Sequence, residues 1–121
     1  MIKKLATATA FCALMAGAAQ AEKIGVAMSL FDDNYLTVLR QNIQRHAGEL
    51  GVEVQMEDAQ GDIARQQSQI ENFVASGVDG VIVMLVDADS GKAMSKIAEK
   101  AGVPLVFVNM LPANMDSFPE K

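Results

Sequence analysis

Apolar and polar positions follow two alternating periods from residue 22 onward, which predicts strands and helices in turn. Short apolar runs predict four strands, at residues 24–28, 52–56, 80–85 and 104–108. Segments with apolar residues every three or four positions predict three helices, at residues 36–50, 62–76 and 90–101. The last two strands are continuously apolar, as strands covered on both faces are. The pattern therefore predicts an α/β fold: a parallel sheet with helices on both faces and right-handed crossovers.

Glycine–valine pairs mark the end of each predicted helix, at Gly51-Val52, Gly77-Val78 and Gly102-Val103. A glycine just past a helix can adopt the left-handed conformation that ends it, and the valine begins the next strand. The pairs are 26 and 25 residues apart, the length of a strand–helix unit. This spacing supports the predicted alternation.

Polar residues gather where the predicted strands end. These residues are Asp32, Asp33, Asn34 and Tyr35 after the first strand, Asp58, Gln60 and Asp62 after the second, Asp87 and Asp89 after the third, and Asn109 after the fourth. Parallel strands end at one edge of the sheet, where ligands of open α/β sheets bind. Carboxylates accept hydrogen bonds and an aromatic ring offers a flat apolar face, a combination that suits a ring with hydroxyl groups on its edge. The sequence therefore indicates a sugar-like ligand.

Each of these residues also has an ordinary structural interpretation. Asp32 or Asp33 would cap the first helix, with the Tyr35 ring packed on its first turn. Asn109 would form a turn, and Asp87 and Asp89 are expected to cap the third helix rather than contact a ligand. Capping and binding by Asp33 both stay open at this point.

Two further polar groups on helices are expected to be solvated surface. The lone histidine, His46, lies off the apolar stripe of the first helix and has no cysteine or second histidine to form a metal site with. The second helix carries a cluster of amides and an acid that is interpreted as a solvated face, namely Gln66, Gln67, Gln69 and Glu71.

The first 21 residues have the pattern of a secretory signal peptide: Lys3-Lys4, an apolar stretch over residues 5–15, and the small-residue cleavage pattern Ala19-Gln20-Ala21. The apolar stretch is too short for a membrane-spanning helix. Cys12, the only cysteine, lies inside it, so the mature chain has no thiol for a disulfide or metal site. We expect residues 22–121 to form one exported domain.

Charge and motif content narrow the class of function. Removing Lys3 and Lys4 from ten basic residues leaves eight against 15 acidic ones, a net charge of −7 for the mature chain. This acidity argues against nucleic acid and anionic membranes as partners. The chain has no glycine-rich phosphate loop, nucleophile elbow or metal-ligand spacing, so neither an enzyme nor a cofactor is expected.

Three stretches of the sequence resemble the amino-terminal lobe of periplasmic sugar-binding proteins of ABC importers. They are KIGVAMSLFDDNYLTVLRQNIQ, MEDAQGDIARQQSQIENFVASGVDGVIV and GVPLVFVNMLP. The resemblance covers residues 22–121 and is greatest to the rhizopine and myo-inositol binders of the ribose, galactose and inositol group. It implies a type I periplasmic-binding-protein, Rossmann-like lobe. It also implies capture of a sugar or cyclitol, an inner-membrane permease as partner, possible service to a chemoreceptor, and a monomeric complete protein.

The resemblance also implies ligand-binding roles for three residues. Asp33 and Asn109 correspond to family positions that bond ligand hydroxyls, and Tyr35 to the aromatic that stacks on the ring. Many relatives have arginine directly after the Asn109 position, where this chain has Met110. Family members have two lobes, so we expect the chain to be an incomplete form that carries half a site and has marginal stability.

Other classes of function share part of this pattern. Another pentose or hexose would suit the same site. A receiver-like phosphoacceptor would use the paired acids after the first strand with Asp87, but Asn109 and Met110 stand where a lysine would be needed. The ligand-binding core of a sugar-responsive repressor shares the lobe, but it would need a helix-turn-helix where the signal peptide lies.

Overall fold

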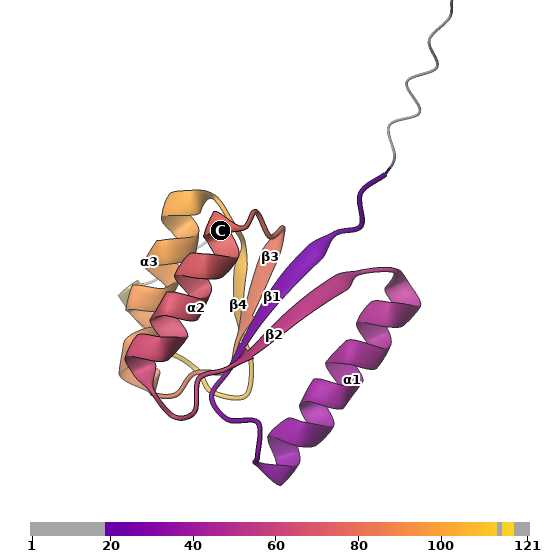
Figure 1. Ribbon diagram of the computed structural model, residues 1–121. Helices are drawn as coiled ribbons and strands as arrows, with labels where there is room; N and C mark the ends of the chain where they lie inside the picture. Colours follow the sequence, from indigo (N-terminus) through magenta and orange to yellow (C-terminus); the bar gives the residue numbers. More distant parts are fainter. Residues whose placement is uncertain (1–18, 114, 118–121) are drawn as a thin grey trace, which may run out of the picture.

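The computed structural model describes residues 19–113 and 115–117, so residues 1–18 of the predicted signal peptide lie outside the described part. Four parallel strands form one sheet in the order β2-β1-β3-β4 (Figure 1). They are β1 (Lys23–Met28), β2 (Glu53–Asp58), β3 (Gly80–Val83) and β4 (Leu105–Phe107). All four lie where the apolar runs predicted strands, and the predicted parallel α/β fold is confirmed.

Helices cover the sheet from both sides: α1 (Asn34–Leu50) lies on one face, and α2 (Ile63–Ala75) and α3 (Gly91–Ala101) lie together on the other (Figure 1). A short 3₁₀ helix, η1 (Ala88–Ser90), precedes α3, and a second one, η2 (Met115–Ser117), follows β4. The three predicted helices begin and end within two residues of these bounds. In the described part of the chain, no helix is long and apolar enough to cross a membrane.

The glycines of the Gly-Val pairs adopt the conformation that the sequence predicted. Gly51, Gly77 and Gly102 have φ angles of 70°, 80° and 68°. Backbone with positive φ is readily available only to glycine. The three pairs therefore end the helices and return the chain to the sheet.

The core has one part on each side of the sheet. Beneath α2 and α3 lie Ala27, Ile70, Phe73, Val78, Val81, Val83, Leu85 and Met94. Beneath α1 lie Val26, Met28, Leu36 and Met84. The Phe73 ring crosses β1 so closely that a Cβ on Gly25 would come within 2.5 Å of it. Glycine at position 25 is therefore required for α2 to pack on the sheet.

Two predicted core positions are exposed. Val106, in the middle of β4, is 55% exposed, so the expectation that both faces of this strand are covered is wrong. Leu105 and Phe107 pack on the α2–α3 side, whereas α1 contacts β2 at the other margin of the sheet. Leu50, the last residue of the predicted α1 stripe, is 78% exposed.

Candidate functional site

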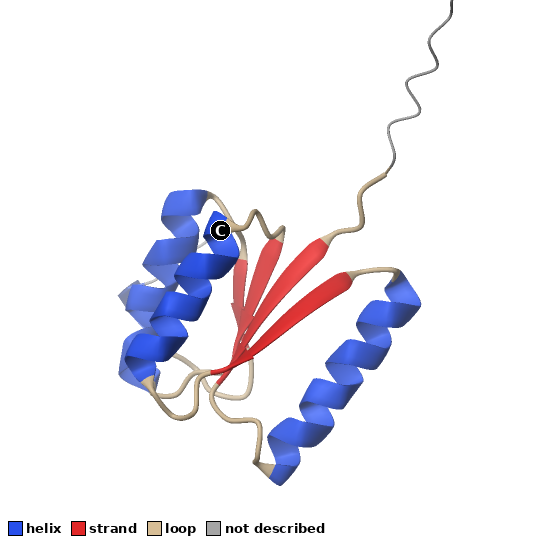
Figure 2. Cartoon of the chain, in the orientation of Figure 1, coloured by secondary structure: helices blue, strands red, loops and turns tan. Residues whose placement is uncertain are grey.

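The strands all end at one edge of the sheet, where the loops leading out of them lie together (Figure 2). Across this edge the loops follow the strand order β2-β1-β3-β4. Neighbouring strands lie about 4.8 Å apart, so β1 and β4, with β3 between them, are separated by about 10 Å. The prediction that the polar clusters share one edge is confirmed, and the spacing matches a single ring with its hydroxyl groups.

Asp33 is the N-cap of α1. Its φ and ψ are −80° and 134°, and its Oδ1 accepts a hydrogen bond from the Leu36 N–H at 2.9 Å. The capping interpretation of Asp33 is therefore confirmed. Its carboxylate is nevertheless exposed, and among the described residues Oδ2 has no hydrogen-bond partner. One oxygen holds the helix, and the other is free to accept a hydrogen bond from a ligand.

The loop before Asp33 is fixed through Phe31. The Thr37 hydroxyl donates to the Phe31 carbonyl at 2.9 Å. The Arg40 guanidinium lies over the Phe31 ring, 4.3 Å from its centroid, a cation–π arrangement. Both contacts come from α1, so the loop and the first turn of the helix form one rigid unit.

Tyr35 occupies the first turn of α1 and is 61% exposed. At this exposure, most of the residue is not covered by packing on that turn. An exposed aromatic ring can offer its apolar face to a ligand.

Asn109 lies just beyond β4 in a tight turn. Its φ is 72°, and the Met110 N–H donates across it to the Val108 carbonyl at 2.9 Å, the hydrogen bond of a γ-turn. Asparagine tolerates positive φ better than most residues. Asn109 thus forms a turn, as one interpretation predicted, and its exposed side chain stays at the sheet edge.

Asp33, Tyr35 and Asn109 therefore share one exposed edge. The first two lie two residues apart on the β1–α1 unit, and Asn109 lies two strands away after β4. No hydrogen bond joins the three within the described residues. The structure brings them to one edge of the sheet.

Other acids of this edge bind the chain's own backbone. Asp58 accepts from the Gln60 N–H at 2.9 Å, and Asp62 caps α2 by accepting from the Arg65 N–H at 2.8 Å. Asp87 accepts from the Asp89 N–H at 2.8 Å and so caps η1. The expectation that Asp87 and Asp89 cap the third helix is wrong, because the N-cap position of α3 is Ser90, which makes no side-chain capping bond.

The amide cluster on α2 differs from its prediction as a solvated face. Gln66 is fully buried, and its carboxamide bonds Met84 and Val86 at the end of β3. Gln69 is half-buried and its Nε2 donates to the Asp58 carbonyl at 2.9 Å. The spacing indicates the burial of Gln66, because Gln66 precedes the buried Ile70 by four residues and so lies on the same helix face.

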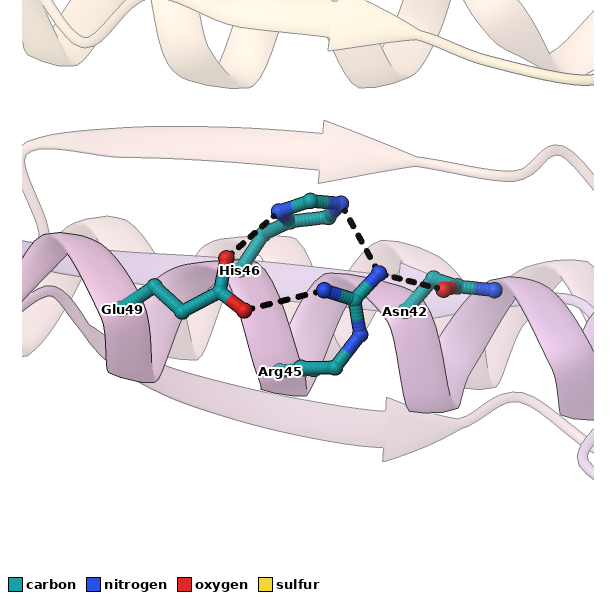
Figure 3. A network of polar contacts seen from close by, with 4 residues as sticks. All are labelled: Asn42, Arg45, His46 and Glu49. Atoms are coloured by element: carbon teal, nitrogen blue, oxygen red, sulfur yellow. Dashed lines mark hydrogen bonds and ion pairs between the residues drawn. The ribbon is translucent and has the colours of Figure 1, made fainter.

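His46 lies on the exposed side of α1, as predicted. Its Nδ1 is 3.0 Å from Glu49, its Nε2 is 3.2 Å from Arg45, and Arg45 also bonds Asn42 (Figure 3). All four side chains belong to α1, away from the strand ends. Within residues 19–113 and 115–117, no cluster of His, Cys, Asp and Glu could hold a metal ion.

A separate groove of about 620 Å³ lies between α3 and β4. Its walls are mostly apolar and include Val103, Leu105 and Pro112. None of the three predicted ligand residues lines it. A ring with many hydroxyl groups is better matched by the polar edge.

Comparison with known proteins agrees with this architecture. The family model described as periplasmic binding protein domain matches residues 24–119. A Rhizobium meliloti protein named for rhizopine binding is 50% identical over 121 residues, which cover 99% of this chain and 39% of that protein. The ribose import binding protein of Bacillus subtilis is 28% identical over 86 residues, 71% of this chain and 28% of that protein.

Solved structures agree as well. An ABC transporter solute-binding protein from Bacillus halodurans with bound myo-inositol superposes with a TM-score of 0.76 at 31% identity. The match covers 83% of this chain and 35% of that one. The chain thus spans well under half the length of the relatives that it matches. On its sequence and its fold, the chain belongs to the periplasmic binding protein family.

Proposed function

We propose that residues 22–121 form the amino-terminal lobe of a periplasmic solute-binding protein. This protein captures a sugar or cyclitol of the myo-inositol or rhizopine kind for an ABC importer. One observation carries the proposal: an exposed carboxylate and an exposed aromatic ring on the rigid β1–α1 unit face the same edge as an exposed amide after β4. The relatives named for rhizopine binding and solved with myo-inositol support this class of ligand.

In this proposal each of the three residues has a separate task. The free oxygen of Asp33 accepts a hydrogen bond from a ring hydroxyl, and the Asn109 carboxamide bonds a second hydroxyl about 10 Å across the edge. The Tyr35 ring covers one apolar face of the ligand. Binding requires no bond to be made or broken, so the protein is a carrier rather than an enzyme.

A single lobe leaves the other face of the ligand in water, whereas good ligand sites bury about 70–90% of it. We therefore propose that a second lobe closes over the ligand in the native-length protein, and that the permease recognises the closed form. Export by the leader at residues 1–21 belongs to the same proposal, and family membership supports a periplasmic location. A chemoreceptor is a further candidate partner for the closed form.

Calorimetric titration of the native-length protein with myo-inositol, ribose and galactose tests the proposal. We expect saturable 1:1 binding, with myo-inositol bound more tightly than the two sugars. Tighter binding of ribose or galactose would reassign the ligand within the same class. No heat with any ring polyol would contradict the proposed function.

A further inference from the structure

Gln66 is a buried polar residue at the base of the proposed site. It lies in α2 and none of its surface is exposed to solvent. Its Nε2 donates to the Met84 carbonyl at 2.8 Å and to the Ala27 carbonyl at 3.5 Å. Its Oε1 accepts from the Val86 N–H at 3.1 Å. Both ends of the carboxamide are thus bonded to backbone where β1 and β3 end.

These partners are the groups that β1 would bond if it continued beside β3. At the end of this strand pair, the Met84 N–H donates to the Ala27 carbonyl at 2.9 Å. In a continuing parallel ladder, the Met84 carbonyl and the Val86 N–H would next pair with the N–H and C=O of Ser29. The Gln66 carboxamide takes the place of those Ser29 groups.

The backbone of Ser29 bonds on the β2 side of β1 instead of the β3 side. Its carbonyl accepts from the Gly61 N–H at 2.9 Å, and the preceding Met28 carbonyl accepts from the Ala59 N–H at 2.8 Å. Both donors belong to the loop after β2. Strand β1 therefore leaves β3 at Ser29 and follows the β2 loop instead.

The separation of β1 from β3 occurs where the strand order changes direction. The chain passes from β1 to β2 on one side of β1 and later returns to β3 on the other side of β1. Ligands of open α/β sheets bind in the crevice at such a switch point. At this switch point the β1–α1 unit with Asp33 and Tyr35 lies on one side, and the loops after β3 and β4, including Asn109, lie on the other.

We propose that Gln66 is a positioning residue that holds this crevice open and sets the spacing of its two sides. The inference rests on the proposed function and concerns the geometry of the same site. Strands that separate leave an unpaired acceptor and an unpaired donor, and a buried backbone group without a partner is costly. The glutamine side chain supplies a donor and an acceptor in one planar group, so it satisfies both.

The first test compares Gln66→Met with Gln67→Met in the native-length protein. The first change keeps an apolar filler of similar length but removes both kinds of bond. The matched control removes a glutamine from the same helix whose side chain, among the described residues, bonds Glu71 on the surface. Myo-inositol affinity is measured by calorimetry at a temperature where circular dichroism shows both variants folded.

We expect the dissociation constant of Gln66→Met to rise about 10- to 100-fold, the order that a misplacement of about 1 Å costs. The control should stay within about twofold of wild type. Hydrogen exchange should show faster exchange of the Val86 amide in Gln66→Met alone. A merely structural role would lower the unfolding temperature and leave the affinity of the folded protein unchanged, and that result would overturn the proposal.

The second test measures myo-inositol binding by Gln66→Glu as a function of pH. It tests the positioning role of Gln66 even if Gln66→Met does not fold. A protonated carboxyl has one donor and one acceptor and can replace the amide, whereas a carboxylate cannot donate to Met84. Burial favours the protonated form. We expect weak binding by Gln66→Glu at pH 8 and recovery toward wild type as the pH falls to 5.5. Wild type and Gln67→Glu should show no such recovery, and equal pH profiles for all three would contradict the proposal.

These experiments distinguish failure of the proposed function from failure of the positioning role of Gln66. If wild type binds no ring polyol, the proposed function is wrong, and the Val86 exchange still reports whether Gln66 holds the loop. If wild type binds myo-inositol and Gln66→Met binds it equally well, only the positioning role is wrong.

Discussion

The β1–α1 and β2–α2 junctions have nearly the same capping geometry but different surroundings. In each, an aspartate N-cap accepts from the backbone N–H three residues later, Asp33 from Leu36 at 2.9 Å and Asp62 from Arg65 at 2.8 Å. The β1–α1 junction adds an exposed aromatic ring, Tyr35, two residues after its cap. The β2–α2 junction instead ties its loop to its own backbone and to β1.

The loop after β2 supports its neighbour rather than presenting ligand groups. Gly61 bonds the Ser29 carbonyl, Asp58 binds the Gln60 N–H, and Gln69 holds the Asp58 carbonyl. This difference teaches that a capping aspartate does not by itself mark a binding site. What separates the two junctions is the exposed Tyr35 ring and the position of β1 at the switch point.

The largest expected effect follows from removing the carboxylate at each junction in turn. Asp33→Ala should weaken myo-inositol binding by about 2–4 kcal/mol, because a ligand hydroxyl loses a charged acceptor. Asp62→Ala removes an equivalent cap and should leave the affinity of the folded protein unchanged. Calorimetry on the two variants measures both effects, and equal losses of affinity would show that the junctions do not differ as we propose.

A smaller effect is expected at the aromatic ring. Tyr35→Ala should cost about 1–1.5 kcal/mol of binding free energy, the range of a stacked aromatic contact, and Tyr35→Phe should retain most of it. Val38→Ala, at another exposed position of α1, is the matched control. Should Tyr35→Ala bind as well as the control, the ring does not contact the ligand.

The capping roles predict a matched change in stability. Asp33→Ala and Asp62→Ala should each lower the free energy of unfolding by about 1 kcal/mol, because each exposes an unpaired N–H at a helix start. Asp→Asn at the same positions should cost much less, since asparagine is an equally good cap. Urea denaturation followed by circular dichroism measures these values. A large loss for only one of the two alanine variants would mean that only that cap is formed in solution.

The smallest effect concerns the backbone of the β2–α2 loop. Gln60 has a φ of 54°, which costs free energy for a residue with a side chain. Gln60→Gly relieves that cost but adds flexibility to the unfolded chain, so we expect a gain of no more than about 0.5–1 kcal/mol. Myo-inositol affinity should not change, because this loop presents no ligand group. Denaturant titration and calorimetry on one sample check both statements.

Much of the fold was predictable because it depends on local patterns. The Gly-Val pairs placed the ends of the helices, and the apolar periods identified the four strands in order. Coverage of β4 was not predictable in this way, because the exposure of Val106 depends on which strands α1 lies over. The continuous apolar run at residues 104–108 has the same appearance whether or not a helix covers it.

The site was predictable to the level of the sheet edge and no further. Parallel strands and their following polar residues led to the sheet edge, and the family resemblance then singled out Asp33, Tyr35 and Asn109, whose ligand contacts stay a prediction. Gln66 was misassigned because glutamine is usually exposed, although its spacing from Ile70 placed it on the buried face. Its partners lie 18 to 39 residues away in the chain, so only the folded structure reveals them.

The most direct test of the account is to locate the ligand by nuclear magnetic resonance, titrating myo-inositol into the ¹⁵N-labelled native-length protein. Within this lobe we expect the largest amide shifts at residues 31–36 and 108–110, with little change at residues 60–65. Shifts confined to the β2–α2 junction, or to the groove between α3 and β4, would contradict the proposed site.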